Sequence, residues 1–154
     1  MIKIQGGTKS QKHRAYSMAE FCVSKLMPRL HYIDLTISIK NLGGEVCGYC
    51  MAFDDDSRPD RPRSFEIEVN KTLRLRKLLT TIAHEMVHVK QYARGELYQS
   101  CRMRKYRWQG KWQNKNINYW DQPWEIEAHG REAGLFIQWA EKEQIGHLKW
   151  TLDD

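Results

Sequence analysis

The sequence predicts a single α+β domain that covers residues 1–154. Three observations support this fold class. Apolar residues recur at helical spacing near the N-terminus, three short segments then alternate apolar and polar residues, and two long helical segments follow. A hydrophobic content of 41% suits one hydrophobic core. We expect an N-terminal helix, a small mostly antiparallel sheet and two further helices.

The first predicted elements are one helix and three strands. Residues 10–30 favour a helix because their apolar positions repeat every three or four residues, with Pro28 near the end. The stretch "YIDLTISIK" alternates as a half-buried strand, and Gly43 and Gly44 mark the turn after it. Residues 46–53 and "SFEIEV" predict the second and third strands. The loop "DDDSRPDRPRS" between them is interpreted as solvated rather than as a calcium site.

The second half predicts two long helices separated by an insert at about 97–120. The first helix is expected to be capped by Thr72 or Asn70 and to end at Gly95. Within the insert, "YRWQGKWQ" is typical of a β-hairpin that turns at Gln-Gly. The last helix starts at "DQPWEIEA", with Asp121 or Gln122 as its cap, and Gly146 stops it.

Composition indicates a cytoplasmic protein that does not contact membranes. No apolar run approaches the roughly 18 residues that cross a bilayer, and the first residues lack the apolar part of a secretory signal. The four cysteines are therefore interpreted as reduced and buried or half-buried, with a metal or redox pair at "CGYC" as the alternative; they are Cys22, Cys47, Cys50 and Cys101.

The stretch "HEMVH" within the long helix predicts a metal site. His84 and His88 are four residues apart, so they point the same way and their nitrogens can meet one ion. Glu85 lies about 100° around the helix, where it can reach a water on the metal without ligating the ion. This is the HExxH pattern of zinc hydrolases. The alternative is a pair of surface histidines, one of them satisfied by Glu85.

A catalytic zinc usually has three protein ligands and one open position, so a third ligand must come from elsewhere. The segment "PWEIEAHGREAG" offers four ionisable groups on one helix: Glu125, Glu127, His129 and Glu132. A solvated helix face is the alternative interpretation. Arg131 follows Glu127 by four residues, so it can orient that carboxylate as an outer partner. We favour Glu127, with His129 and Glu125 left open.

"HEMVH" followed by "WEIEA" on a later helix resembles the gluzincin metallopeptidases. This resemblance implies a zincin-like single domain whose C-terminal helix carries the third ligand. The narrower resemblance is to small single-domain members, namely minigluzincin-like and ImmA/IrrE-like proteins and phage-encoded putative metallopeptidases; a phage origin would place the protein in the host cytoplasm. In such families the glutamate just before the alanine is the third ligand, which implies Glu127. SprT-like proteases are a neighbouring comparison, on the basis of "HG" at His129 and Gly130.

These residues predict a zinc-dependent metallopeptidase that cleaves peptide bonds in a protein or peptide substrate. Glu85 is expected to act as general base towards a zinc-activated water. Tyr98 and Tyr119 are the preferred oxyanion donors, with Tyr106 and His129 also possible. The alternative is a basic nucleic-acid-binding or regulatory protein with a structural or catalytically silent zinc, or a DNA-associated SprT-like protease.

The net charge of +6 is unevenly distributed, with basic regions at residues 1–30 and 94–115 and an acidic one at 116–154. Residues 94–115 carry seven Lys and Arg against Glu96 alone. Cations interleaved with aromatic rings are typical of single-strand nucleic-acid binding, and they also suit an acidic protein partner. The alternative is a hairpin whose rings cover the core. The predicted contacts are Arg102, Arg104, Lys105, Arg107, Trp108, Lys111 and Trp112.

Overall fold

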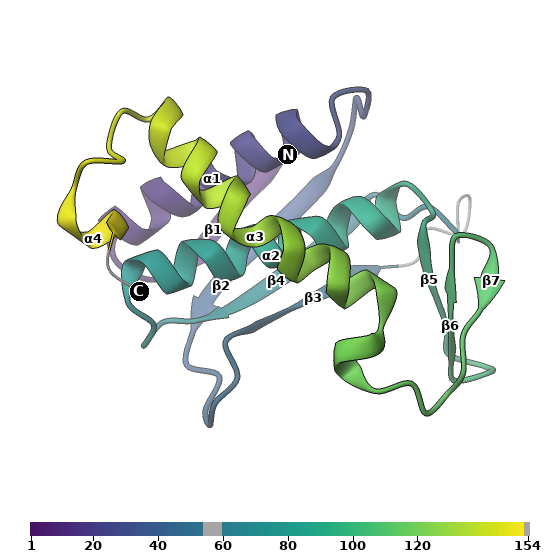
Figure 1. Ribbon diagram of the computed structural model, residues 1–154. Coiled ribbons are helices and arrows are strands. Elements are labelled where there is room, and N and C mark those ends of the chain that lie inside the picture. Colours follow the sequence, from purple (N-terminus) through teal and green to yellow (C-terminus); the bar gives the residue numbers. More distant parts are fainter. Residues whose placement is uncertain (54–59, 153–154) are drawn as a thin grey trace.

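The computed structural model describes residues 1–53 and 60–152 and confirms the α+β class (Figure 1). The elements in chain order are β1 (Ile2–Gly6), α1 (Lys9–Leu26), β2 (Asp34–Lys40), β3 (Gly48–Phe53), β4 (Ser64–Asn70), α2 (Leu75–Ala93), β5 (Leu97–Ser100), β6 (Lys105–Trp108), β7 (Lys111–Trp112), the 3-10 helix η1 (Tyr119–Asp121), α3 (Pro123–Lys142) and α4 (Lys149–Leu152). The acidic run Asp54–Asp56, interpreted from sequence as a solvated loop, lies outside the described residues. Over the described parts of the chain, no helix combines the length and apolar character needed to cross a bilayer.

The larger sheet has the strand order β1-β2-β4-β3. β1 pairs with β2 and β2 with β4 in parallel, and only β3 runs antiparallel to its neighbour β4. The expectation of a mostly antiparallel sheet is therefore wrong. The short strand β1 was not predicted, and α1 crosses over between β1 and β2, which is the connection that parallel neighbours require.

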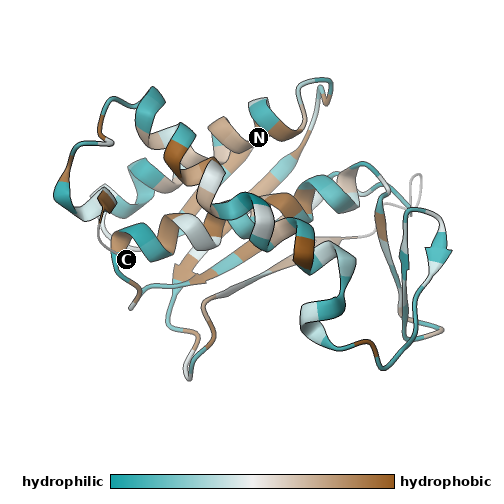
Figure 2. Cartoon of the chain, in the orientation of Figure 1, coloured by the Kyte–Doolittle hydropathy of each residue, from teal (hydrophilic) through white to brown (hydrophobic). Residues whose placement is uncertain are grey.

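The core lies between this sheet and the helices, which cover one of its faces (Figures 1 and 2). α1 and α2 contact the strands, and α3 packs mainly on α2. Ile37 of β2 is fully buried and aligns with Ile4 of β1 and Ile67 of β4, so one apolar row runs across three strands. The opposite face carries polar contacts, such as the Ser38 hydroxyl donating to Glu66 at 2.9 Å.

The insert folds as a second, three-stranded sheet in the order β5-β6-β7. β6 and β7 are joined by Gln109 and Gly110, both with positive φ, at 45° and 82°. Two left-handed residues in a two-residue loop match the twist of a hairpin, which confirms the prediction for "YRWQGKWQ". Figure 1 shows this sheet at one end of the molecule, beyond the C-terminal end of α2.

The expected helix ends are confirmed in part. Gly95 follows α2 with φ 71°, and Gln122 precedes Pro123 at the start of α3. The expected cap of α2 is wrong, because Arg74 occupies the N-cap position with no side-chain cap. Asn70 instead accepts from the Thr72 amide and hydroxyl, which closes the turn before the helix.

The cysteines are all free, as expected. Cys22 is buried, and Cys47 and Cys50 are half-buried. Cys101 is exposed, which corrects the expectation for that residue, because it lies in the turn between β5 and β6 rather than under a helix.

Gly6 and Gly43 have the same φ but different surroundings, so their alanine variants can show how closely β1 and β2 approach each other. Gly6 and Gly43 both have φ +69°, but a Cβ on Gly6 would lie 2.1 Å from the Ile39 carbonyl oxygen, whereas one on Gly43 meets nothing within 4 Å. We expect Gly43→Ala to cost only the left-handed strain of roughly 1–2 kcal/mol. Gly6→Ala should lower the free energy of unfolding by clearly more, as measured by urea denaturation. Equal losses would contradict this close approach.

Candidate metal centre

His84 and His88 project from one side of α2 towards α3. Their Nε2 atoms are 3.2 Å apart, and the two residues are only 7% and 8% exposed. Burial of two imidazoles inside a helix that packs on the sheet and on α3 requires partners for all four ring nitrogens. The positions of these partners define the site.

Glu125, in the first turn of α3, completes a triangle with the two histidines. Its Oε2 lies 3.3 Å from His84 Nε2, and its Oε1 lies 3.4 Å from His88 Nε2. Ligand atoms at 2.0–2.1 Å from a tetrahedral ion are separated from one another by roughly 3.3–3.4 Å. The three side chains therefore have the spacing of ligands around one such ion, and together they can hold a metal.

The preference for Glu127 as third ligand is corrected by its contacts. Its carboxylate accepts from Lys90 Nζ at 2.6 Å, from Gln91 Nε2 at 3.0 Å and from Arg131 Nε at 2.9 Å. Residues two apart on a helix point about 200° away from each other, so Glu125 and Glu127 cannot face the same ion. The predicted contact between Arg131 and Glu127 is present, but it supports an outer partner rather than a ligand.

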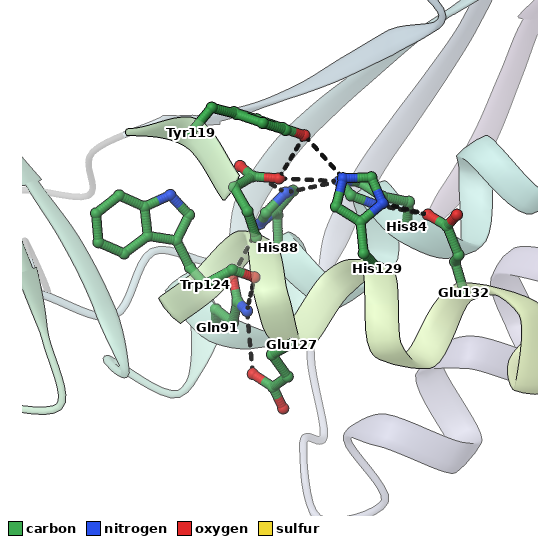
Figure 3. A network of polar contacts seen from close by, with 9 residues as sticks. His84, His88, Gln91, Tyr119, Trp124, Glu127, His129 and Glu132 are labelled. Atoms are coloured by element: carbon green, nitrogen blue, oxygen red, sulfur yellow. Dashed lines mark hydrogen bonds and ion pairs between the residues drawn. The ribbon is translucent and has the colours of Figure 1, made fainter. Parts of the chain in front are cut away.

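Gln91 fixes the proton of His88. Its side-chain Nε2 donates to the Trp124 carbonyl and to Glu127 Oε2, both at 3.0 Å, so its Oε1 faces His88 Nδ1 at 2.8 Å (Figure 3). An amide oxygen can only accept, so His88 Nδ1 carries the hydrogen and its Nε2 presents a lone pair to Glu125 and His84. Gln91 is completely buried, which leaves this amide no alternative orientation in water.

Glu132 has the same role for His84. Its Oε2 lies 2.7 Å from His84 Nδ1, so this nitrogen donates and His84 Nε2 turns its lone pair towards His88. Two nitrogen lone pairs and a carboxylate then converge within 3.4 Å, an arrangement that repels unless a cation lies between them. Burial lowers the pKa of His84, but hydrogen bonds to Glu125 and Glu132 outweigh it and raise the pKa to about 9. A proton can thus substitute for the cation in metal-free protein.

His129 does not join the first group of ligands. It lies 3.4 Å from Glu132 through Nδ1, and its Nε2 contacts the Tyr119 hydroxyl at 3.0 Å. His84, His129 and Glu132 form a second set of neighbouring donor atoms. Because Glu132 is already committed to His84 Nδ1, we interpret this set as the outer support of the first group.

Glu85 lies on the wall of a cavity of about 310 Å³ that opens beside these ligands. Burial raises the pKa of its carboxyl, and the neighbouring His88 and His84 oppose that rise. Gly48 of β3 also lines the cavity next to Glu85, and an added Cβ there would lie 2.8 Å from the Thr81 side chain and 3.7 Å from Glu85 Oε1. Gly48 thus lets β3 approach α2 closely at the level of Glu85.

Of the two preferred oxyanion donors, only Tyr119 lines this cavity. Its hydroxyl donates to Glu125 Oε2 at 2.8 Å. Burial, followed by the contact with Glu125, raises the pKa of Tyr119, so the hydroxyl stays protonated and able to donate. Tyr98 does not line the cavity; it contacts Arg107 and Trp112 on the second sheet. The less favoured Tyr106 does line it.

Sequence reasoning missed Gln91, Glu132 and Gly48 as parts of the site. Gln91 follows His88 by three residues on the same helical face, which was a usable signal. Glu132 was noted only as one of several acids. Comparison of the chain with models of protein families, with curated proteins and with solved structures gives no match.

The ligand set predicts different metal contents for two neighbouring carboxylate variants. Glu125→Ala should lose most of the metal retained after loading with zinc and desalting, because it removes one of three ligands. Glu127→Ala should retain a larger share, because it removes only an outer contact of Gln91. Elemental analysis of both variants checks this. Loss of zinc in Glu127→Ala alone would instead support Glu127 as the third ligand.

The role of Gln91 predicts an intermediate effect. Gln91→Met keeps similar volume but removes the acceptor of His88 Nδ1, so zinc affinity should fall by roughly 10–100-fold, as is usual when an outer-shell partner is lost. A competition titration against a chromogenic chelator measures this. Gln138→Met, on an exposed position of α3, is the matched control and should bind as the wild type does. An unchanged affinity for Gln91→Met would show that the tautomer of His88 does not depend on this amide.

Proposed function

We propose that the protein is a zinc-dependent metallopeptidase. The observation that carries the proposal is the triangle of His84 Nε2, His88 Nε2 and Glu125, with sides of 3.2–3.4 Å, beside a buried Glu85. Two imidazoles and one carboxylate form a donor set that suits zinc and that is found at catalytic zinc sites. The arrangement supports the resemblance to gluzincins, with Glu125 rather than Glu127 as the carboxylate.

Catalysis rather than a structural role is favoured by the open side of the site. Across residues 1–53 and 60–152, no fourth His, Cys, Asp or Glu joins this triangle. A cavity of about 310 Å³ lies there instead. Structural zinc sites are usually closed by four protein ligands, whereas catalytic ones keep a position open. When bound, zinc would polarise a carbonyl oxygen and lower the pKa of a coordinated water.

Glu85 is the proposed general base. It follows His84 directly and lines the cavity rather than the triangle. A general base works best with a pKa near the operating pH, and burial shifts the pKa of Glu85 upward in that direction. Glu85 would accept a proton from the attacking water and pass it to the leaving amine. The Tyr119 hydroxyl, which donates its single hydrogen to Glu125 in the free protein, would turn that hydrogen to the developing oxyanion when substrate binds.

The proposed substrate is an extended peptide bound along β3. β3 is at the edge of its sheet, and its residues Gly48, Tyr49 and Cys50 line the cavity next to Glu85. An edge strand can pair with an extended chain through backbone hydrogen bonds. Because such pairing does not depend on side chains, it would place a scissile bond at the metal with limited sequence preference.

The decisive experiment separates metal binding from turnover. Zinc-loaded protein should cleave denatured protein substrates, and cleavage should stop on chelation and return with zinc. Glu85→Gln should keep its zinc and its fold while turnover falls by roughly 10²–10⁴-fold, since only base catalysis is removed. Mass spectrometry of the cleavage products and elemental analysis measure the two effects.

Glu141→Gln, an exposed glutamate of α3, is the matched control and should behave as the wild type. Zinc lost in parallel with activity in Glu85→Gln would make Glu85 a ligand or a structural residue. Cleavage that persists in Glu125→Ala after chelation would exclude this site as the source of activity.

A further inference from the structure

The outward face of the β5-β6-β7 sheet carries an aromatic row interrupted by one cation. Tyr98 of β5 aligns with Arg107 of β6, and Arg107 aligns with Trp112 of β7. The three side chains therefore stand side by side across the sheet. We propose that this row is a binding surface for single-stranded nucleic acid, in addition to the proposed activity at the metal centre.

The contacts within the row are those of a stacked cation. The Arg107 guanidinium carbon lies 4.9 Å from the ring centre of Tyr98 and 5.7 Å from that of Trp112. The two rings are edge to face, with their centres 6.2 Å apart. Held this way, Arg107 and Trp112 lose little side-chain freedom when a ligand binds, so the row is preorganised. Trp112 is 43% exposed and available to a base.

The opposite face of the same sheet packs against α3. Tyr106 and Trp108 point inward, where their rings lie 4.9 Å and 6.4 Å from that of the buried Trp124. Trp108, which the sequence predicts as a contact, is half-buried and lies on the face opposite the row, so it is not part of the proposed surface. This arrangement also leaves the Tyr98–Arg107–Trp112 row without a part in that packing, so the alternative in which the aromatic residues cover the core accounts for only one face.

Charge around the row favours a polyanion. Residues 97–120 contain no Asp or Glu. Their six cations are Arg102, Arg104, Lys105, Arg107, Lys111 and Lys115. Arg107 pairs with Asp60 at 2.9 Å, but Asp60 is 57% exposed. Exposed ion pairs contribute little, so a phosphate can replace Asp60 at small cost.

The combination of rings and cations favours single-stranded nucleic acid over an acidic polypeptide or a duplex. The acidic side chains of a polypeptide would use the cations, but Asp and Glu have no flat rings to stack on Trp112. A duplex would use the cations, but its bases are already stacked on one another. An unpaired strand uses both, because each base can stack on a ring while the phosphates contact Lys and Arg, with little dependence on sequence.

Fluorescence anisotropy of a labelled thymidine oligomer of about 15 nucleotides tests this surface. Zinc-loaded protein should bind it, and the affinity should fall steeply between about 50 and 200 mM salt, because neutralised phosphates release counterions. Trp112→Ala should weaken binding by about tenfold, as expected for the loss of one stacking contact, and Arg107→Gln should also reduce the salt dependence. Tyr32→Ala removes an exposed ring (62%) far along the chain from the row, and should bind normally.

Several results would overturn the proposal. Absence of binding at low salt excludes it. Binding that Trp112→Ala leaves unchanged, or equal binding of a glutamate-rich peptide, would indicate a purely electrostatic surface for an acidic polypeptide. A preference for duplex over single strand would exclude stacking. Glu125→Ala should lose the metal but still bind the oligomer. The nucleic-acid proposal and the peptidase proposal can therefore be rejected independently of each other.

Discussion

The packing of α2 against α3 is the constraint on which the convergence of His84, His88 and Glu125 depends. Three lone-pair donors within 3.4 Å repel unless a cation lies between them, so their positions must be imposed by other contacts. Gln91 provides one of them, since it bridges His88 to the Trp124 carbonyl and Glu127 across the helix interface. Ala128 is fully buried between the helices and keeps them close. The three candidate ligands are thus positioned by the packing of two helices, without the help of an ion.

A buried charge network extends this support to the second sheet. Lys90 is only 5% exposed, and its ammonium lies 2.6 Å from both Glu127 and Glu96. A buried ammonium requires such partners, because desolvation otherwise costs more than a single ion pair returns. The backbone of Glu96 in turn accepts from the Gln109 amide at 2.7 Å, at the turn of the hairpin. The contacts that join α2 to α3 near Glu125 therefore continue into the sheet that forms part of the cavity wall.

Local patterns predicted much of this structure, and contacts between elements decided the rest. The HExxH helix, its end at Gly95 and the hairpin at Gln109 and Gly110 follow from residues close in sequence. The choice between Glu125 and Glu127 does not, because both are carboxylates on the same helix. A contact between helices distinguishes them: the ammonium of Lys90 on α2 forms an ion pair with the carboxylate of Glu127, which leaves Glu125 for the histidines. Strand β1 was missed for a similar reason, because its five residues are recognisable as a strand only through pairing with β2 and packing on α1.

Strand alternation keeps the two proposed activities on separate surfaces of one small sheet. Successive residues of a strand point to opposite faces, so Arg107 points outward while Tyr106 and Trp108 point towards Trp124. The inward residues Leu97, Gln99 and Tyr106 line the metal cavity. A ligand on the outer face therefore shares a backbone, but no side chain, with the proposed peptidase site. Any coupling between the two surfaces would pass through the backbone of β5 and β6, and Glu96, just before β5, is held to α2 by its ion pair with Lys90. A single-stranded nucleic acid bound to the outer face would then bring protein substrates near the cavity without altering the chemistry of the cavity.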